Sequence, residues 1–260
     1  PDETLRIAQE LYEKKMTTYP RTDARVLSSA VAKEIHKNIG GLRNYALAAP
    51  FAKEVLEQGT YKNIAKTRYV NDKQITDHYA IIPTGQGLNN LAGLAPTAAK
   101  VYEVIVRRFL SIFYPPAVYQ KFSLTLQVKE ESFFASFKVL IQEGYLKVTN
   151  FSFKKENTAL KEDKENENES ADEKCDAELT SLLMQLKKQD TLSADTYEIK
   201  EGETSPPKRY TSGSIILTME NAGQFIEDEE LRAQIKGSGI GTSATRAEII
   251  KKLVNNKYLD

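Results

Sequence analysis

Tyr19 lies between Thr18 and Pro20, with Arg21 two residues further along the chain. A phenol oxygen can attack a phosphodiester and hold the phosphate as an ester, which a sugar hydroxyl can later reverse. The ordinary pKa of a tyrosine is about 10, so such a nucleophile needs positive charge or a base nearby. The planar guanidinium of Arg21 can supply charge and bind the phosphate. These residues predict ATP-independent, reversible cleavage of a nucleic-acid strand, although a core tyrosine beside a surface arginine would show the same two residues.

An amphipathic helix is expected immediately before the tyrosine, over residues 1–16. Acidic residues occupy its first turn and lysines its last, as the helix dipole favours. Pro20 disfavours helical geometry at Tyr19. We therefore expect the helix to end before the tyrosine, which would lie on an extended segment. Apolar residues recur in this range at spacings of mostly three and four, as on one helix face: Leu5, Ala8, Leu11, Tyr12 and Met16.

Three long motifs follow one another along the chain. The first is Leu5-x-x-Ala8-Gln9-x-Leu11-Tyr12-Glu13, continued by Thr18-Tyr19-Pro20-Arg21-Thr22-Asp23. The second is Thr76-Asp77-His78-Tyr79-Ala80-Ile81-Ile82-Pro83-Thr84, and the third runs from Gly239 to Ile250 as Gly-Ile-Gly-Thr-Ser-Ala-Thr-Arg-Ala-Glu-Ile-Ile. In these motifs and their order the chain resembles the type IA DNA topoisomerases. The proline after the tyrosine resembles the topoisomerase III branch.

The resemblance implies a role for each matching residue. Tyr19 would be the nucleophile that becomes joined to the 5′ phosphate of a cut single strand. Arg21 would orient that phosphate and stabilise its charge, and His78 would contact a phosphate nearby. Further matching positions would support the site: Gln9, Glu13, Thr18, Thr22 and Asp23.

The third motif also has a physical interpretation of its own. Its glycines make the backbone flexible, and Thr242 or Ser243 can cap a helix that begins near Ala244. Free amides at such a helix start attract phosphate. A well-capped helix without a ligand is the alternative. Thr245 matches a DNA-contacting threonine of the family. The expected DNA-binding residues are therefore Thr242, Ser243, Thr245 and Arg246.

The resemblance implies a magnesium ion that these residues do not bind. In type IA enzymes the metal site lies in a Toprim-type domain with a glutamate and an Asp-x-Asp motif, and no Asp-x-Asp occurs here. The chain begins at Pro1, inside the expected helix and without an initiator methionine. We therefore expect a fragment whose Mg²⁺ is bound by the missing Toprim domain, with no metal ligand of its own. Alone, it is expected to be inactive.

Composition is consistent with this reading. Net charge is zero overall, but residues 1–120 carry 16 Lys and Arg against 11 Asp and Glu, or +5, which suits DNA. Residues 151–205 carry 8 against 15, or −7. A single cysteine, Cys175, excludes an internal disulfide and favours a reducing compartment. No signal peptide and no bilayer-spanning run is visible. We expect a cytoplasmic protein with no membrane partner.

Changes in periodicity divide the chain into three expected domains. Residues 1–117 would form a helical domain that carries the tyrosine, with an extended connection from Arg68 to Pro83. Residues 118–210 would be rich in β-strands, with a mobile acidic loop at 155–178, and the resemblance implies that this part is an arch or hinge. Residues 211–260 would form a helical DNA-binding segment. The fold class is thus α+β multidomain, as in a toroidal type IA topoisomerase.

Individual elements are expected as follows. Strands are expected around 122–126, 133–139 and 145–148, and Leu179 to Leu186 would be a short strand or helix. Helices are expected at 26–38, 50–57, 97–113, 215–222, 228–235 and 244–255.

Two other classes of protein use some of these features. A tyrosine recombinase has the same nucleophile, but its tyrosine normally follows the catalytic arginines and histidine, whereas Tyr19 precedes Arg21 and His78. A non-catalytic DNA-binding module of winged-helix character would need only the helices and the basic surface. For the topoisomerase the expected partner is single-stranded DNA, bound mostly through phosphates, with no small-molecule substrate and a monomeric protein.

Overall fold

The computed structural model describes residues 2–75, 77–153, 177–193, 196, 198–199, 201–235, 239–242 and 245–259. Its backbone contacts form two compact units. The first combines Pro1–Phe109 with Thr204–Asp260, and the second is Leu110–Glu203. The expected boundaries after residues 117 and 210 stay predictions. Apart from residues 177 and 178, the expected acidic loop at 155–178 lies outside the described residues.

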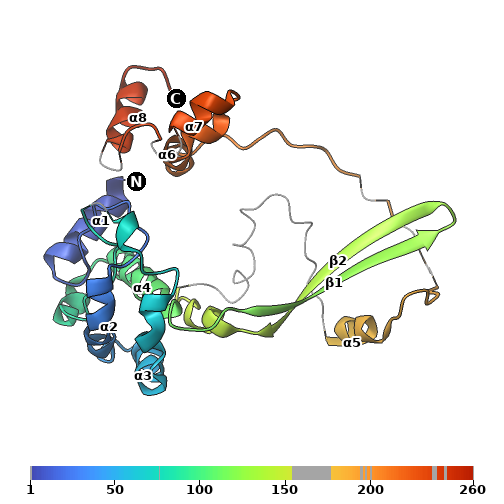
Figure 1. Cartoon of the computed structure of the whole chain (residues 1–260), viewed down its shortest axis with the longest axis horizontal. Helices are drawn as coiled ribbons and strands as arrows, with labels where there is room; N and C mark the ends of the chain where they lie inside the picture. The colour runs from blue at the N-terminus through green and yellow to red at the C-terminus, as the bar shows by residue number, and fades with distance from the viewer. Residues whose placement is uncertain are drawn as a thin grey trace. The chain divides into compact units, whose positions relative to one another are not determined.

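Helices build the first unit, as the periodicity of residues 1–113 predicts (Figure 1). The observed α-helices begin and end within about four residues of the expected bounds. Short 3-10 helices occupy the connections: η1 (Thr60–Lys66), η2 (Asp72–Gln74) and η3 (Leu88–Gly93). The α-helices of this part are α1 (Asp2–Glu13), α2 (Ser29–Leu42), α3 (Ala49–Gln58) and α4 (Pro96–Ser111), whose last two residues belong to the second unit.

The core of this part forms where the apolar faces of these helices are buried. Helix α2 packs against α3 and η1. Each helix contributes side chains at helical spacing, so the same period that predicted the helices also predicts their buried faces. Fully or nearly fully buried are Leu11 of α1, Ile35, Ile39 and Leu42 of α2, Val55 of α3, and Tyr102 and Val106 of α4.

The core also encloses an ion pair within α4. Arg107 Nε lies 2.6 Å from Glu103 Oε1, and both side chains are more than nine-tenths buried. The Arg107 guanidinium lies over the ring of Phe51, 5.5 Å from its centroid. Burial, with the nearby Glu103 carboxylate as a second cause, raises the pKa of Tyr45 to about 12. The two buried charges therefore compensate each other within the core.

Helix α1 ends at Glu13, three residues earlier than expected, in a tight turn. Lys15 adopts a left-handed conformation with φ 60°. The amide of Lys15 donates to Tyr12 O (2.8 Å) and that of Met16 to Leu11 O (2.9 Å). This is the Schellman pattern, in which the two residues flanking the turn, here Leu11 and Met16, are both buried. The turn directs the chain out of the helix and into the extended segment that carries Tyr19.

The start of α2 is capped from two sides. The Ser28 hydroxyl accepts a hydrogen bond from the amide of Val31. The Asp72 carboxylate accepts from the backbone amide of Ser29 (2.8 Å) and from its hydroxyl (2.5 Å). These hydrogen bonds from Ser29 lower the pKa of Asp72 below its ordinary value of 3.8. Asp72 is the first residue of η2, which follows Val70 along the chain. Its hydrogen bonds therefore tie η2 to the N-terminus of α2.

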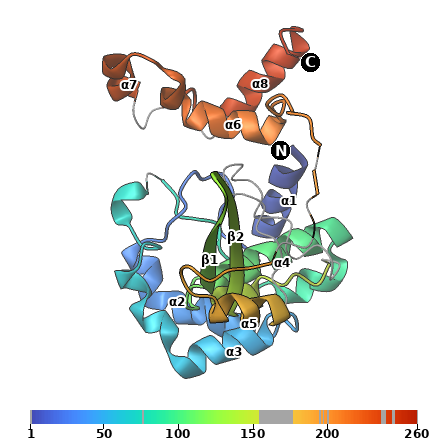
Figure 2. The same ribbon diagram turned by 90° about the vertical axis from the view of Figure 1, so that its right-hand side faces the viewer.

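The remainder of the first unit is helical as expected. Helix α6 (Ser212–Glu220) begins with a capping box between Thr211 and Ser214. It is followed by η6 (Ala222–Phe225), α7 (Glu229–Ile235) and α8 (Arg246–Asn255). Helices α6 and α8 pack against each other (Figure 2). Helix α8 ends in a second Schellman turn, with Lys257 left-handed at φ 59°.

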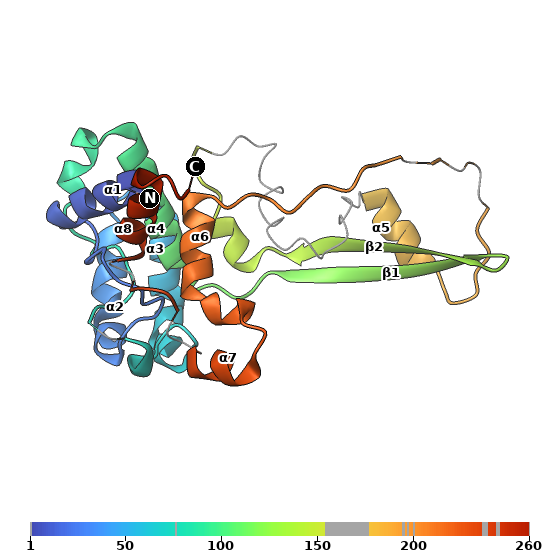
Figure 3. The same ribbon diagram turned by 90° about the horizontal axis from the view of Figure 1, so that it is seen from above.

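The second unit contains a two-stranded antiparallel ribbon (Figure 3). Strand β1 (Val118–Val128) pairs with β2 (Glu131–Gln142), as alternation predicted. The expected strand at Tyr145–Val148 is wrong, because these residues lie in the 3-10 helix η4 (Gly144–Val148). Gly144 is left-handed against the carbonyls of Pro115 and Pro116, and Tyr145 N donates to Pro115 O, so the chain turns there.

Helix α5 (Ala177–Gln185) settles the open alternative at Leu179–Leu186 in favour of helix. Within the described ranges, no helix is both long and apolar enough to cross a bilayer.

Substituting Asp72→Asn should reduce the acid sensitivity of folding. A carboxyl group whose folded pKa is lowered stabilises the fold above its unfolded value, here about 3.8, and loses that stabilisation as pH falls through the lowered folded value. The asparagine keeps one acceptor but carries no charge. We expect lower stability than wild type at pH 7 and a shallower decline below pH 4, measured by urea unfolding at a series of pH values. An unchanged acid slope would contradict this role of Asp72.

Candidate active site

The segment that carries Tyr19 pairs with the segment that follows His78. Thr18 N donates to Ile82 O (3.0 Å), and Thr84 N donates to Met16 O (3.0 Å). The Thr18 hydroxyl donates to Ala80 O (3.2 Å) and accepts from Ile82 N (2.9 Å). One threonine therefore bridges the two segments through both its backbone and its side chain.

A second threonine fixes the backbone of the histidine. The Thr22 hydroxyl donates to His78 O (2.8 Å) and accepts from Ala24 N (3.0 Å). Ala80 N donates to Val26 O (2.9 Å), which extends the contact between the two segments. The first and second motifs are thus joined on both sides of the tyrosine, by Thr18 before it and by Thr22 after it.

The second segment is in turn anchored on α2. Asn38 Nδ2 donates to Pro83 O (2.9 Å). Gly41 and Gly85 meet backbone to backbone, and a Cβ atom at Gly41 would overlap Gly85 O. Gly85 is also left-handed, with φ 75°. Glycine is needed at both positions for this close approach, and the approach sets the distance between α2 and the segment that carries His78.

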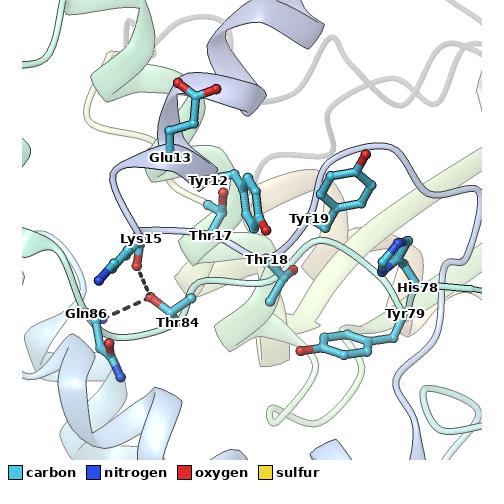
Figure 4. Close-up of a pocket in the computed structure, with 10 residues that line it drawn as sticks. All are labelled: Tyr12, Glu13, Lys15, Thr17, Thr18, Tyr19, His78, Tyr79, Thr84 and Gln86. Atoms are coloured by element: carbon cyan, nitrogen blue, oxygen red, sulfur yellow. Dashed lines mark hydrogen bonds between the residues drawn. The ribbon is translucent and has the colours of Figure 1, made fainter.

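Three aromatic rings meet at the tyrosine. The ring centroids of Tyr19 and His78 lie 4.5 Å apart with the planes tilted by 46°. Tyr12 and Tyr19 make an edge-to-face contact, with centroids 5.3 Å apart and planes at 80°. Figure 4 shows the Tyr19 ring between the rings of Tyr12 and His78. Such contacts contribute about 0.5 to 1.5 kcal/mol each, so they restrict the orientation of the Tyr19 ring without burying it.

These residues line an open cleft of about 580 Å³. Tyr19 is half-buried in its wall, His78 is exposed, and Tyr12 is 40 % exposed. The Thr17 side chain is only 1 % exposed, and its hydroxyl has no hydrogen-bond partner within the described part of the chain. The lining consists of Tyr12, Glu13, Lys15, Thr17, Thr18, Tyr19, His78, Tyr79, Thr84 and Gln86.

Most of the expected site residues are brought together here. Tyr19, His78, Thr18 and Glu13 all line the cleft. Gln9 reaches it indirectly, because its Nε2 donates to Glu13 Oε1 (3.0 Å). Thr22 acts on the backbone of His78, as described above.

Two expected residues are not gathered into the cleft. Arg21 and Asp23 are exposed and are absent from its lining. Neither side chain makes a hydrogen bond or ion pair with another described residue. Arg21 lies two residues after Tyr19, and its side chain is exposed.

The described residues of the third motif, 239–242 and 245–250, include the beginning of α8. The N-cap is Thr245, without a side-chain capping bond, so the expected cap at Thr242 or Ser243 is wrong. The Thr245 hydroxyl instead accepts from the amide of Thr242 (2.8 Å). Arg246 is 8 % exposed and donates to Ile240 O (3.1 Å) and Gly241 O (3.2 Å), which makes its guanidinium a brace for the turn. The role of these residues in DNA binding stays a prediction, and Ser243 lies outside the described residues.

Several residues of the cleft were not expected from the sequence. Tyr12 was assigned to the apolar face of α1, yet its ring contacts that of Tyr19. Lys15 was assigned to the last helical turn, although it follows the helix. Tyr79 directly follows His78 in the second motif. This adjacency could have identified it as a residue of the cleft. No group of three or more His, Cys, Asp or Glu side chains that could hold a metal ion occurs within the described ranges.

Comparison with known proteins identifies the family of the chain. A family model described as DNA topoisomerase matches residues 1–260. DNA topoisomerase 3 of Bacillus licheniformis is 34 % identical over 262 residues, which cover 99 % of this chain and 33 % of that protein. DNA topoisomerase 3 of Bacillus subtilis has the same identity and coverage. Full-length topoisomerase I of Thermotoga maritima has a similar fold, with a TM-score of 0.51 and 21 % identity over 100 % of this chain and 35 % of that one.

The chain belongs to the DNA topoisomerase family. The predicted assignment to the type IA class and its topoisomerase III branch is confirmed, because the curated relatives are DNA topoisomerase 3 enzymes. The mixed helical and β fold agrees with that of the Thermotoga maritima enzyme. The chain spans about a third of the length of the curated relatives that it matches.

Replacing Thr18 by valine should destabilise the fold by about 1 to 3 kcal/mol. The substitution leaves a half-buried amide at Ile82 and a carbonyl at Ala80 without the Thr18 hydroxyl. Thr18→Ser is the matched control, because it keeps the hydroxyl and loses one methyl group, at a cost of about 0.8 kcal/mol. Urea unfolding measures both. Equal destabilisation by the two variants would mean that the hydroxyl bridge contributes nothing.

Proposed function

We propose that this chain is the nucleophile-bearing part of a type IA DNA topoisomerase that cuts and rejoins one DNA strand through Tyr19. The observation that carries the proposal is the position of the Tyr19 ring, held against His78 at the wall of an open cleft. A phenol half-exposed in a cleft can reach a strand that enters it, whereas a core tyrosine cannot. The first two of the three motifs that carry the family resemblance are the segments that meet there.

The reaction balances without an outside energy source. The Tyr19 oxygen attacks the phosphorus and forms a 5′-phosphotyrosine, and the 3′ oxygen of the preceding sugar leaves as a hydroxyl, taking up a proton equivalent to the one lost by the phenol. In the reverse step that hydroxyl attacks the ester and restores both. The guanidinium of Arg21 would stabilise the additional charge on the phosphate in the transition state. His78 would contact an adjacent phosphate, and a positive imidazole favours that contact.

Magnesium is proposed to come from a Toprim-type domain outside these 260 residues. The described residues offer no group of carboxylates or imidazoles that fits the ion. When bound in that domain, the metal would help to place the phosphate and balance its charge. These 260 residues alone would then hold the nucleophile but not complete the reaction.

The other parts of the chain fit strand passage. The ribbon of β1 and β2 would belong to the hinge of an arch that carries the tyrosine away from the rest of the enzyme. Single-stranded DNA would be recognised mainly through its phosphates, with little reading of sequence. We further propose that the enzyme is monomeric and cytoplasmic and acts on neither a membrane nor a small molecule.

Covalent capture tests the nucleophile. The full-length enzyme, incubated with magnesium and a single-stranded oligonucleotide labelled at its 3′ end, should give a labelled adduct that resists denaturation. A 5′ label should stay with the free fragment, because the ester forms on the 5′ phosphate. Tyr19→Phe should give no adduct. A non-catalytic DNA-binding module predicts no adduct from either protein, and an adduct from the Phe variant would assign the nucleophile to another residue.

Substitution of His78 tests the second motif. His78→Ala in the full-length enzyme should weaken strand binding and slow cleavage about 10-fold, because losing one hydrogen bond to a charged phosphate costs about 1.5 kcal/mol. His36→Ala is the matched control, since His36 lies on α2 and its ring faces Tyr61 at 6.3 Å. Unchanged cleavage by His78→Ala would remove this histidine from the site.

A further inference from the structure

Lys15 brings a positive charge to the cleft that contains Tyr19. Its side chain is exposed, and its ammonium makes no ion pair or hydrogen bond with another described residue. The preceding lysine differs, because Lys14 Nζ lies 3.2 Å from Glu10 Oε1. Lys15 therefore offers a cation that is not already neutralised by the fold.

The backbone of Lys15 is held rigidly. Its amide donates to Tyr12 O (2.8 Å), and its carbonyl accepts from the Thr84 hydroxyl (2.6 Å), a bond drawn in Figure 4. Lys15 and Tyr19 are four positions apart in the chain, so their Cα atoms are at most about 14 Å apart. Figure 4 places the Lys15 side chain on the other side of Thr17 and Thr18 from the Tyr19 ring. A phosphate that Lys15 binds is therefore a neighbour of the phosphate that Tyr19 attacks.

The wall of the cleft between Lys15 and Tyr19 offers a second observation that points to a polar ligand. Thr17 is a lining residue of the cleft, and its buried hydroxyl lacks a hydrogen-bond partner in the described part of the chain. An unpaired polar atom in a wall is costly unless something pairs with it. The other charged group of the lining, the Glu13 carboxylate, is engaged by Gln9.

We infer that Lys15 is a phosphate-binding residue, which holds the DNA backbone next to the scissile phosphate and so positions the strand for Tyr19. This inference rests on the proposed function, because it assumes that the strand lies in this cleft. Its chemistry is that of a point charge on a flexible stem binding one phosphodiester. A strand bound at Lys15 and at the scissile position would be fixed at two points and could not slide between attack and resealing.

The left-handed conformation of Lys15 allows a test in which stability and DNA affinity are expected to change in opposite directions. Lys15→Gly should raise the melting temperature of the full-length enzyme by about 2 °C, because glycine adopts φ 60° without strain. The same variant should weaken binding of a short single-stranded oligonucleotide. Loss of one phosphate contact predicts a Kd about fivefold higher at 0.1 M salt and a salt slope lower by about 0.7. A purely structural role for Lys15 would not weaken binding in a protein that has become more stable.

Lys257→Gly is the matched control. Lys257 occupies the same position of the same kind of turn, at φ 59°, but does not line the cleft. It should give a similar rise in melting temperature with unchanged affinity, which also shows that a lysine in this conformation is not by itself a binding residue. Lys15→Arg should bind DNA as wild type does, because it keeps the charge.

Lys15→Met removes the charge but leaves a non-glycine residue in the left-handed conformation. If the glycine variant folds poorly, this variant tests whether the charge of Lys15 contributes to DNA binding. Weakened binding by Lys15→Met supports the inference, and a Kd and salt slope equal to wild type overturn it. The covalent adduct is measured on the same oligonucleotide. Unchanged binding with an intact adduct would refute the role of Lys15 alone, whereas absence of an adduct in wild type would refute the proposed function.

Discussion

The pairing of Met16–Thr18 with Ile82–Thr84 is the constraint on which the site depends. Two backbone hydrogen bonds form the pair, and the Thr18 hydroxyl adds one bond in each direction. The partners are more than sixty residues apart in sequence, so only a completed fold brings them together. Without this pair, Tyr19 would stand on a free segment after α1, and His78 would stand on a separate connection. With it, the two rings become neighbours at a fixed separation.

The elements on either side of the pair hold the Tyr19 and His78 rings at this separation. On one side, the Schellman turn at Lys15 anchors the tyrosine segment to α1 through buried Leu11 and Met16. On the other side, the glycine contact between Gly41 and Gly85 anchors the histidine segment to α2. The cleft is thus walled by irregular backbone, yet each irregular segment is only a few residues from a helix in the core. Rigid support at both ends is what allows the half-buried Tyr19 ring to keep one orientation.

Much of the fold follows from patterns in the sequence, but the site follows only in part. The spacing of apolar residues predicted α2, α3 and α4, because the residues on the buried face of a helix recur every three or four positions. The spacing of apolar residues could not predict where α1 ends, because that end depends on one left-handed residue, Lys15. It also failed at Tyr145–Val148, where apolar residues suited a strand but Gly144 and the neighbouring carbonyls impose a turn. The proximity of Tyr19 and His78 came from the family resemblance, since spacing along a chain carries no information about such a pair.

Charge in the sequence does not show which basic side chains the fold itself binds, and the reason is local. Arg246 looked available for DNA beside a glycine-rich turn, but two carbonyls of that turn bind its guanidinium. Arg107 is enclosed with Glu103 in the core. Lys15 looked like an ordinary helix-terminal lysine, yet its backbone turns it to the cleft while its ammonium stays unpaired within the described residues. A basic residue is free to bind phosphate only where the fold supplies no closer acceptor. That condition depends on where neighbouring carbonyls and carboxylates point, and therefore becomes visible only in three dimensions.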